Sequence, residues 1–239
     1  MKKGFTLAET LITLAVIGVV ASLTIPNLVT ANNKKLYASA LASNVSNIEH
    51  VLSSLISKQN LNWLEETDFY EDITSSNLVT KRQSAGELGS YLDISGFGTT
   101  AAIAESPGYT EGITGLNGTA DNSIMSTGFF YKLKNGALIN FETVNNPVTA
   151  SDNNRLVKQI FVLNIDINGI AKPNKCGRDI FKFAVDTSGK LFPYGGSAYN
   201  EYSSEGKWDT GANNLTCPGT GLGYGCAGRL VDNGYVMDY

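Results

Sequence analysis

The feature that most constrains this chain is an almost wholly apolar run near its N-terminus, from Phe5 to Ile25, which contains a single acidic residue, Glu9. As a helix with a rise of about 1.5 Å per residue, the run spans roughly the hydrocarbon thickness of a bilayer. A charged side chain inside such a segment is energetically costly, so it is a functional candidate whose partner should be sought. The run therefore predicts a transmembrane helix in which Glu9 has a specific role.

The residues around the start of this run resemble the leader of the type IV pilin superfamily, which includes pilus subunits and the pseudopilins of type II secretion. Members of that family carry a short basic leader that ends in glycine, then a phenylalanine, then a glutamate at the fifth position after the cleavage point. Residues 1–4 match the leader, with Gly4, Phe5 and Glu9 at the three family positions. The resemblance implies cleavage after Gly4 by a prepilin peptidase and methylation of the new amine of Phe5.

The same resemblance implies how subunits associate. Cleavage leaves a cation at Phe5, and Glu9 of a neighbouring subunit can neutralise it inside the membrane or a filament core, where the low effective dielectric makes an ion pair matter. We therefore expect other pilin or pseudopilin subunits as partners, in a filament of one or several kinds of subunit.

Two other interpretations of the same run are open. An ordinary secretory signal would be removed at small residues such as Ala15, Ala21 or Ser22, which would release a soluble protein. The second interpretation is a single-pass membrane anchor that is not processed. The acid early in the run and the very short leader argue against the secretory signal.

The charges of the leader indicate an orientation in the membrane. Lys2 and Lys3 precede the run, and the positive-inside tendency keeps them in the cytoplasm. The expected localisation is thus the bacterial inner membrane, with one span and a C-terminal domain outside the cytoplasm, and a pilus or pseudopilus after assembly.

Pro26 interrupts the apolar run, and a proline removes one backbone donor and predicts a kink or local opening. Beyond it, residues 26–59 are amphipathic, with apolar residues at three- and four-residue steps. We predict one long helix from Thr6 to about Lys58, in which 5–25 cross the membrane and assemble and 26–59 pack on a globular domain of residues 60–239. The apolar positions are Leu36, Tyr37, Ala40, Leu41, Val45, Ile48, Leu52, Leu55 and Ile56.

The charge balance argues against a nucleic-acid partner. The chain has 18 Lys and Arg residues against 22 Asp and Glu, a formal net charge of −4, and loss of the two leader lysines makes it −6. An acidic body attracts neither DNA nor anionic lipid in general.

The chain contains 25 glycines, which suggests a loop-rich domain with short strands.

The body of the chain predicts short helices followed by a sheet. Residues 60–95 suggest one or two helices, with Trp63 and Tyr70 in the core, and 96–128 suggest a long glycine-rich loop. An Asn135-Gly136 turn between two apolar runs is a strong hairpin signal. The fold class is α+β and pilin-like, with a small antiparallel sheet of about four or five strands at 129–133, 137–144, 159–167, 179–186 and 190–192, and a further candidate strand at 235–239.

Three cysteines lie in the last third of the chain, as suits an oxidising compartment. Cys217 and Cys226 enclose a glycine-rich loop, and we predict a disulfide between them that stabilises the fold by roughly 2–3 kcal/mol. Cys176 is then buried and free, or joined to one of the others.

A loop between Asp166 and Asp179 is the one candidate for a cation. Its oxygen-bearing side chains include Asn168 and Asn174, but no glutamate stands where a calcium loop needs its bidentate ligand. An Asx-type turn without a cofactor is the preferred interpretation, and a structural calcium ion is the alternative.

Charged stretches offer two weaker candidates. Six basic residues stand between 155 and 182, and we interpret them as solvated charges at a strand edge rather than as a DNA site. An acidic stretch at 65–72 is interpreted as exposed. The basic residues are Arg155, Lys158, Lys172, Lys175, Arg178 and Lys182.

No set of residues resembles a catalytic site, and the single histidine, His50, falls between apolar positions of the predicted helix. The interpretation is therefore a non-enzymatic structural subunit, a pilin or pseudopilin, of a type IV pilus or a type II secretion pseudopilus. The competing interpretation is a membrane-anchored extracellular binding module, an adhesin or a minor pilin of DNA uptake.

Overall fold

A computed structural model describes residues 6–75, 77–99, 112–121, 124–125, 129–144, 149–152, 155–197, 215–218 and 221–239. The chain divides into two compact units, Met1–Leu36 and Tyr37–Tyr239, which are described separately. The predicted fold class is confirmed: a long N-terminal helix and an antiparallel sheet form an α+β, pilin-like arrangement.

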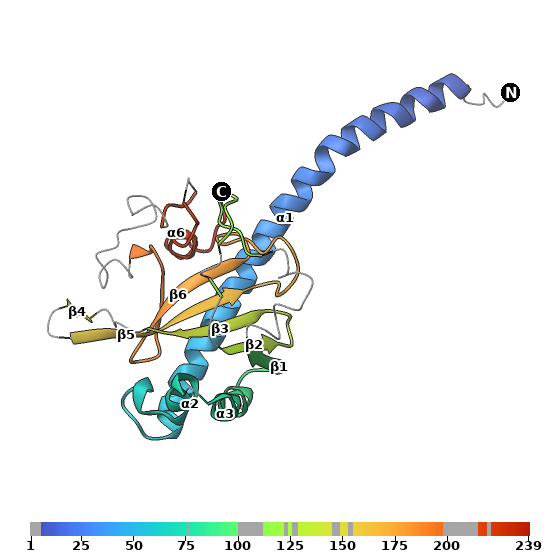
Figure 1. Ribbon diagram of the computed structural model, residues 1–239. Helices are drawn as coiled ribbons and strands as arrows, with labels where there is room; N and C mark the ends of the chain where they lie inside the picture. The colour runs from blue at the N-terminus through green and yellow to red at the C-terminus, as the bar shows by residue number, and fades with distance from the viewer. Residues whose placement is uncertain are drawn as a thin grey trace. The chain divides into compact units, whose positions relative to one another are not determined.

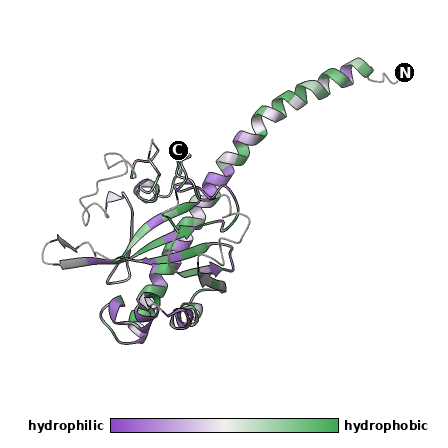
Figure 2. Cartoon of the chain, viewed as in Figure 1, coloured by the Kyte–Doolittle hydropathy of each residue, from purple (hydrophilic) through white to green (hydrophobic). Residues whose placement is uncertain are grey.

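The long helix α1 (Leu7–Lys58) is continuous through Pro26, with bounds close to those predicted. Pro26 has no N–H to donate to the preceding turn. Nearby, the side-chain amide of Asn27 donates to the carbonyl of Leu23 at 3.1 Å. Hydrophobic residues dominate the first part of α1 (Figure 2) and fall on one face of its second part, because only that part contributes to a globular core.

Seven strands make up the sheet within the described residues, and all their pairings are antiparallel. Six follow one another in the order β1-β2-β3-β5-β6-β7, and β4 pairs with β5 beside this path. Their bounds are β1 (Ile94–Thr99), β2 (Phe129–Leu133), β3 (Leu138–Thr143), β4 (Thr149–Asp152), β5 (Arg155–Asp166), β6 (Ile180–Asp186) and β7 (Leu191–Pro193).

The predicted hairpin at the centre of the sheet is confirmed. β2 and β3 pair with Phe129 opposite Phe141, and Gly136 in the turn between them has a φ of 93°. This left-handed conformation is easy for glycine and costly for other residues. The Asn135 side chain accepts a hydrogen bond from the N–H of Ala137 at 3.0 Å, which closes the turn.

The core of Tyr37–Tyr239 lies between the second half of α1 and one face of the sheet (Figure 1). Leu41, Ile48 and Leu52 of α1 are fully buried there. They belong to the same cluster as the aromatic side chains of β2, β3, β5 and β6, several of which meet edge to face. The aromatic residues are Phe129, Tyr131, Phe141, Phe161, Phe181 and Phe183.

Short helices cover one end of this core: η1 (Leu64–Glu66), α2 (Asp68–Thr74) and α3 (Leu78–Gly89) (Figure 1). Thr67 caps α2, since its hydroxyl accepts from the N–H of Tyr70 at 3.3 Å. The prediction that Trp63 fills the core is wrong, because 47% of this side chain is exposed. Its neighbour Leu64 is buried in its place, and Tyr70 packs against the core as a partly buried residue.

Four parts of the fold differ from the sequence prediction. Residues 94–99 form β1 where a helix end and a loop were expected, and 149–152 form β4. The disulfide region contains a short helix, α6 (Cys226–Asp232), and the last residues, expected as a strand, are irregular. The predicted loop is otherwise described only at 112–121 and 124–125, where Thr114 bridges Ala120 and Lys175.

Candidate functional site

The N-terminal end of α1 is organised by Thr6 and Glu9. One oxygen of the Glu9 carboxylate, Oε2, accepts from both the backbone N–H and the hydroxyl of Thr6, each at 2.8 Å. In return, the Thr6 hydroxyl accepts from the backbone N–H of Glu9 at 3.3 Å. This is a capping box, in which two residues at a helix N-terminus satisfy each other's donors. Glu9 therefore has a local partner within its own chain.

The predicted processing residues, Gly4 and Phe5, lie outside the described residues, which begin at Thr6. Cleavage after Gly4 and the role of the Phe5 amine stay predictions. Pro26 lies inside α1, well within the unit Met1–Leu36, and its predicted part in assembly likewise stays a prediction.

The apolar side chains of the first part of α1 are exposed in the single chain. Leu7 is 80% exposed, for example. The helix is long and apolar enough to cross a membrane. An exposed apolar helix of this length fits membrane anchoring, and it also fits packing against other helices of the same kind.

The hydroxyl groups on the same segment are satisfied within the helix, which suits an apolar surrounding. The hydroxyls of Thr13 and Thr24 each donate to a carbonyl four residues earlier at 2.9 Å, and that of Ser22 donates to Val19 at 2.8 Å. Between Thr6 and Leu23, Glu9 is the one side chain that carries a formal charge.

At the other end of the chain, Cys217 and Cys226 are joined in a disulfide, the pair chosen from the sequence. Arg229, one turn into α6, donates to the carbonyl of Cys217 at 2.7 Å. Its guanidinium also makes a two-pronged ion pair with Asp238, both contacts at 2.8 Å, and lies 5.2 Å from the centre of the Tyr239 ring. Arg229 therefore ties the disulfide loop, α6 and the C-terminus together.

Cys176 is free and fully buried, which settles the choice left open by the sequence. Burial raises the pKa of its thiol, so the nucleophilic thiolate is disfavoured. His50 is exposed on α1. The buried thiol of Cys176 is therefore a poor nucleophile.

The loop from Asp166 to Asp179 forms the expected Asx-type turn. The N–H of Asn168 donates to the Asp166 carboxylate at 3.2 Å, and the N–H groups of Asn174 and Lys175 donate to Asp179 at 2.9 and 2.6 Å. Burial raises the pKa of Asp179 to about 6, although these backbone donors oppose the rise. In the part of the chain described here, no group of three or more His, Cys, Asp or Glu residues is placed to hold a metal ion. A structural calcium ion in this loop stays the untested alternative to the cofactor-free turn.

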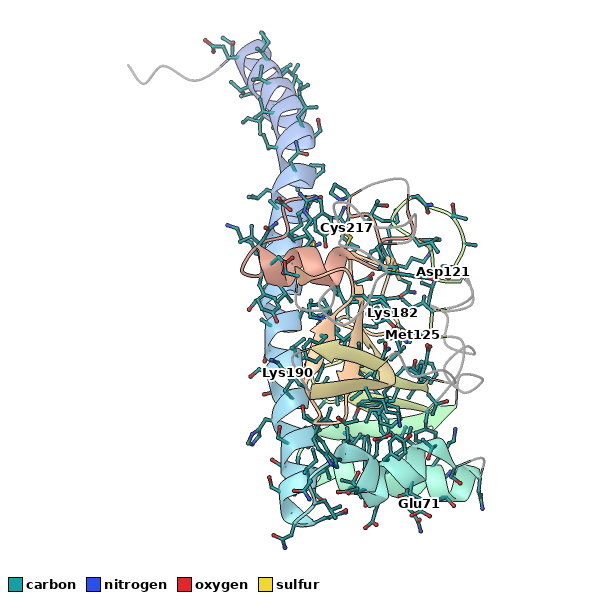
Figure 3. The ribbon with its side chains drawn as sticks, turned by 90° about the vertical axis from the view of Figure 1, so that its left-hand side faces the viewer. Glu71, Asp121, Met125, Lys182, Lys190 and Cys217 are labelled. Atoms are coloured by element: carbon teal, nitrogen blue, oxygen red, sulfur yellow. A yellow bond between two sulfur atoms is a disulfide. The ribbon has the colours of Figure 1, made fainter. Side chains whose placement is uncertain are left out.

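Lys158 and Lys182, two of the six basic residues, contact side chains elsewhere in the described part of the chain. Lys158 forms an ion pair with Glu65. Lys182 lies on the side of the sheet away from α1 (Figure 3), with its ammonium 5.1 and 4.7 Å from the ring centres of Tyr194 and Tyr224. These contacts hold loops against the sheet, and they leave both cations less available to phosphate.

The acidic stretch is partly buried, which corrects the prediction that it is exposed. Asp72 in α2 is 8% exposed, and burial, together with Asp68 and Glu71, raises the pKa of its carboxyl. Burial also raises the pKa of Glu87 in α3 to about 7, with Asp72 as the next cause, and one carboxyl oxygen of Glu87 is buried without a hydrogen bond. Acids thus face each other where α2 and α3 pack.

Sequence reasoning missed the structural partners of the predicted residues. The Thr6-x-x-Glu9 spacing before an apolar run is the recognised signature of a capping box and identifies Thr6. No comparable signal identifies Arg229, because its contacts with Cys217 and Asp238 depend on how the disulfide loop folds back.

Comparison with known families finds one match. Residues 1–25 match the prokaryotic N-terminal methylation motif. No curated protein matches the chain, and no solved structure matches it. The matched residues include both processing positions and Glu9.

Proposed function

Residues 1–25 carry the prepilin-type signature of type IV pilins and pseudopilins, which prepilin peptidase processes, and from this premise we propose the function of the chain. It is a structural subunit of a bacterial type IV pilus or type II secretion pseudopilus. The observation that carries the proposal is Glu9, an acid on an otherwise apolar, exposed helical surface. The proposed function of the chain is filament assembly rather than catalysis.

Processing supplies the partner of Glu9. Cleavage after Gly4 converts Phe5 into a terminal residue with a free cationic amine. An amine and a carboxylate that share an apolar surrounding stabilise each other, whereas each alone is costly. Glu9 of one subunit pairs with the Phe5 amine of the next, and the apolar surfaces of the first halves of α1 pack together.

The capping box gives Glu9 a resting state before assembly. In the isolated subunit, Thr6 donates two hydrogen bonds to the carboxylate, so the acid is not left without partners in the membrane. Assembly then exchanges or adds a partner, and an amine with a full charge makes the stronger contact. The anchor lies in the inner membrane, with residues 60–239 outside the cytoplasm.

The test compares Glu9→Ala with Glu9→Asp in the producing bacterium. Glu9→Ala should be cleaved normally, so mass spectrometry finds an N-terminus at Phe5, but it should be absent from sheared filaments. Glu9→Asp keeps the charge on a shorter side chain and should be incorporated in part. Normal incorporation of Glu9→Ala would refute the assembly role.

The competing function, a membrane-anchored extracellular binding module, makes a different prediction. Such a protein stays in the membrane fraction whether or not Glu9 is present, and a tagged copy does not appear along filaments in electron micrographs. A wild-type subunit that is cleaved at Phe5 but never found in a filament would favour that module.

A further inference from the structure

A groove lies within Tyr37–Tyr239, between the second half of α1, the segment that ends α3 and the β2–β3 turn. Its volume of about 430 Å³ falls within the range of roughly 300–1,000 Å³ that is typical of small-molecule sites. Neither the filament role nor any predicted site residue uses it. We name it the Asn44 groove; its lining includes the polar residues Asn44, Asn47, His50, Asp93, Lys134 and Asn135.

Amide groups are fixed in the wall of this groove. Asn44 is a polar residue that is only 2% exposed, and its side-chain oxygen accepts from the amide of Asn135 at 2.9 Å. Asn135 is held in turn by the N–H of Ala137. Asn47, one turn from Asn44, is exposed, and its side chain makes no hydrogen bond to any described part of the chain. Asn47 therefore presents both a donor and an acceptor.

The groove has no net formal charge. Asp93 and Lys134 are its only residues with a formal charge, and they form an ion pair at 3.0 Å. Because the two charges cancel, the lining favours neither an anion nor a cation. A phosphate or a metal ion is thus a poor fit.

Apolar surface is present beside these polar groups. Val51 and Leu92 lie in the lining but are buried, whereas Tyr91 is 37% exposed, with the Lys58 ammonium 5.7 Å from its ring centre. An aromatic ring next to amides suits a ligand that has both hydroxyl groups and an apolar C–H face. Sugar rings combine these two properties.

We propose that the Asn44 groove binds a short neutral oligosaccharide. Each sugar hydroxyl both donates and accepts, as the exposed amide of Asn47 does, and the C–H face of a ring can lie on Tyr91. This binding is additional to filament assembly and does not depend on it. An exposed domain with such a groove can attach to glycans of a cell surface or a matrix.

Two glycines of α3 allow a matched pair of variants. Gly89 lines the groove and Gly86, three residues earlier, does not. A Cβ added at either position meets no atom within 4 Å, so both sites accept a larger side chain. Gly89→Trp fills the groove, whereas Gly86→Trp adds the same side chain to the same helix outside it.

The experiment uses the full-length protein in micelles of a detergent without a sugar headgroup. Saturation-transfer NMR is recorded with lactose, maltose and N,N′-diacetylchitobiose, and with N-acetylneuraminic acid as a charged comparator. At least one neutral disaccharide should receive saturation from the wild type. Its affinity should fall about tenfold or more in Gly89→Trp and stay unchanged in Gly86→Trp.

A second pair tests the amide directly and does not rely on the tryptophan variants. Asn47→Ala removes one hydrogen-bonding group from an exposed position and should weaken binding about three- to tenfold. Asn62→Ala, at an exposed asparagine outside the groove, should have no effect. The proposal is overturned if no neutral disaccharide binds at about 10 mM, if only N-acetylneuraminic acid binds, or if Gly89→Trp and Asn47→Ala both bind like the wild type.

Discussion

Thr6 and Glu9 satisfy each other's hydrogen bonds at the first turn of α1, through two contacts of 2.8 Å to one carboxylate oxygen. The residue proposed to recognise a neighbouring subunit is therefore already engaged in the single chain. A neighbour's amine must compete with Thr6 or share the carboxylate with it. This relationship separates two roles of Glu9, helix capping and subunit pairing.

Thr6→Val should affect capping and leave pairing in place. The variant removes the hydroxyl that donates to Glu9 and accepts from its N–H, so the helix end should lose about 0.5–2 kcal/mol of stability. Hydrogen exchange of the first-turn amides in micelles should become faster, while filament incorporation is retained. Thr10→Val is the control, because the Thr10 hydroxyl donates only to backbone carbonyls. Loss of incorporation as complete as in Glu9→Ala would contradict this separation.

Elements with strong local signals were predicted correctly, and elements that depend on distant partners were not. The 3.6-residue periodicity predicted α1, and Asn135-Gly136 predicted the central hairpin. β1 was missed because Gly96 and Gly98 weaken its local preference, and its stability comes from pairing with β2 thirty or more residues away.

The same distinction holds at the candidate sites. Cys217 and Cys226 are close in sequence, so their pairing was accessible, and the glycine-rich surroundings hid α6 between Cys226 and Asp232. Trp63 and Leu64 are adjacent and both apolar, so composition alone does not decide which one faces the core. The Asn44 groove combines three segments, and no single stretch of sequence indicates it.

The acids between α2 and α3 predict a pH dependence of stability. Burial, Asp72 and Asp68 raise the pKa of Glu87 to about 7, and the charge of Lys58 opposes this rise. Between pH 4.5 and 7 the folded state therefore holds a proton on Glu87, which the unfolded state releases near the ordinary glutamate pKa of 4.5. Stability should therefore fall as the pH rises from about 4.5 to 7. Glu87→Gln should flatten this slope in thermal melts and raise the melting temperature at pH 8.

The control for that variant is Glu71→Gln, which removes an acid from an exposed position on α2. It should leave most of the slope unchanged, because Glu71 is only a minor cause of the raised pKa of Asp72. An unchanged slope in Glu87→Gln would mean that other groups control the pH dependence.

Arg229 predicts a difference between two cationic side chains. Arg229→Lys keeps the charge but cannot reach the Cys217 carbonyl and both oxygens of Asp238 at once, so it should lower the free energy of unfolding by about 1–3 kcal/mol in urea titrations. Lys134→Ala breaks an ion pair whose partners are largely exposed and should cost less than about 1 kcal/mol. Equal effects of the two variants would show that the Arg229 contacts add little.

Gly228 in α6 predicts a steric effect. A Cβ at this position would overlap the backbone of Gly195 and Gly196, so Gly228→Ala should destabilise the fold by about 1–3 kcal/mol. Gly86→Ala is the matched change in a helix with open space around it, and it should stabilise by about 0.5–1 kcal/mol. Thermal melts of both variants check the two signs, and stabilisation by Gly228→Ala would contradict the close approach.

The burial of Leu41, Ile48 and Leu52 against the aromatic face of the sheet determines where the polypeptide can be shortened for work in water. A fragment that starts at residue 60 lacks all three side chains, and the burial of each stabilises the fold by about 1.5–3 kcal/mol. Their removal also exposes the aromatic rings of the sheet to water. It should precipitate on expression. A fragment that starts near Tyr37 retains this strip of helix and should be recovered as a folded, soluble monomer.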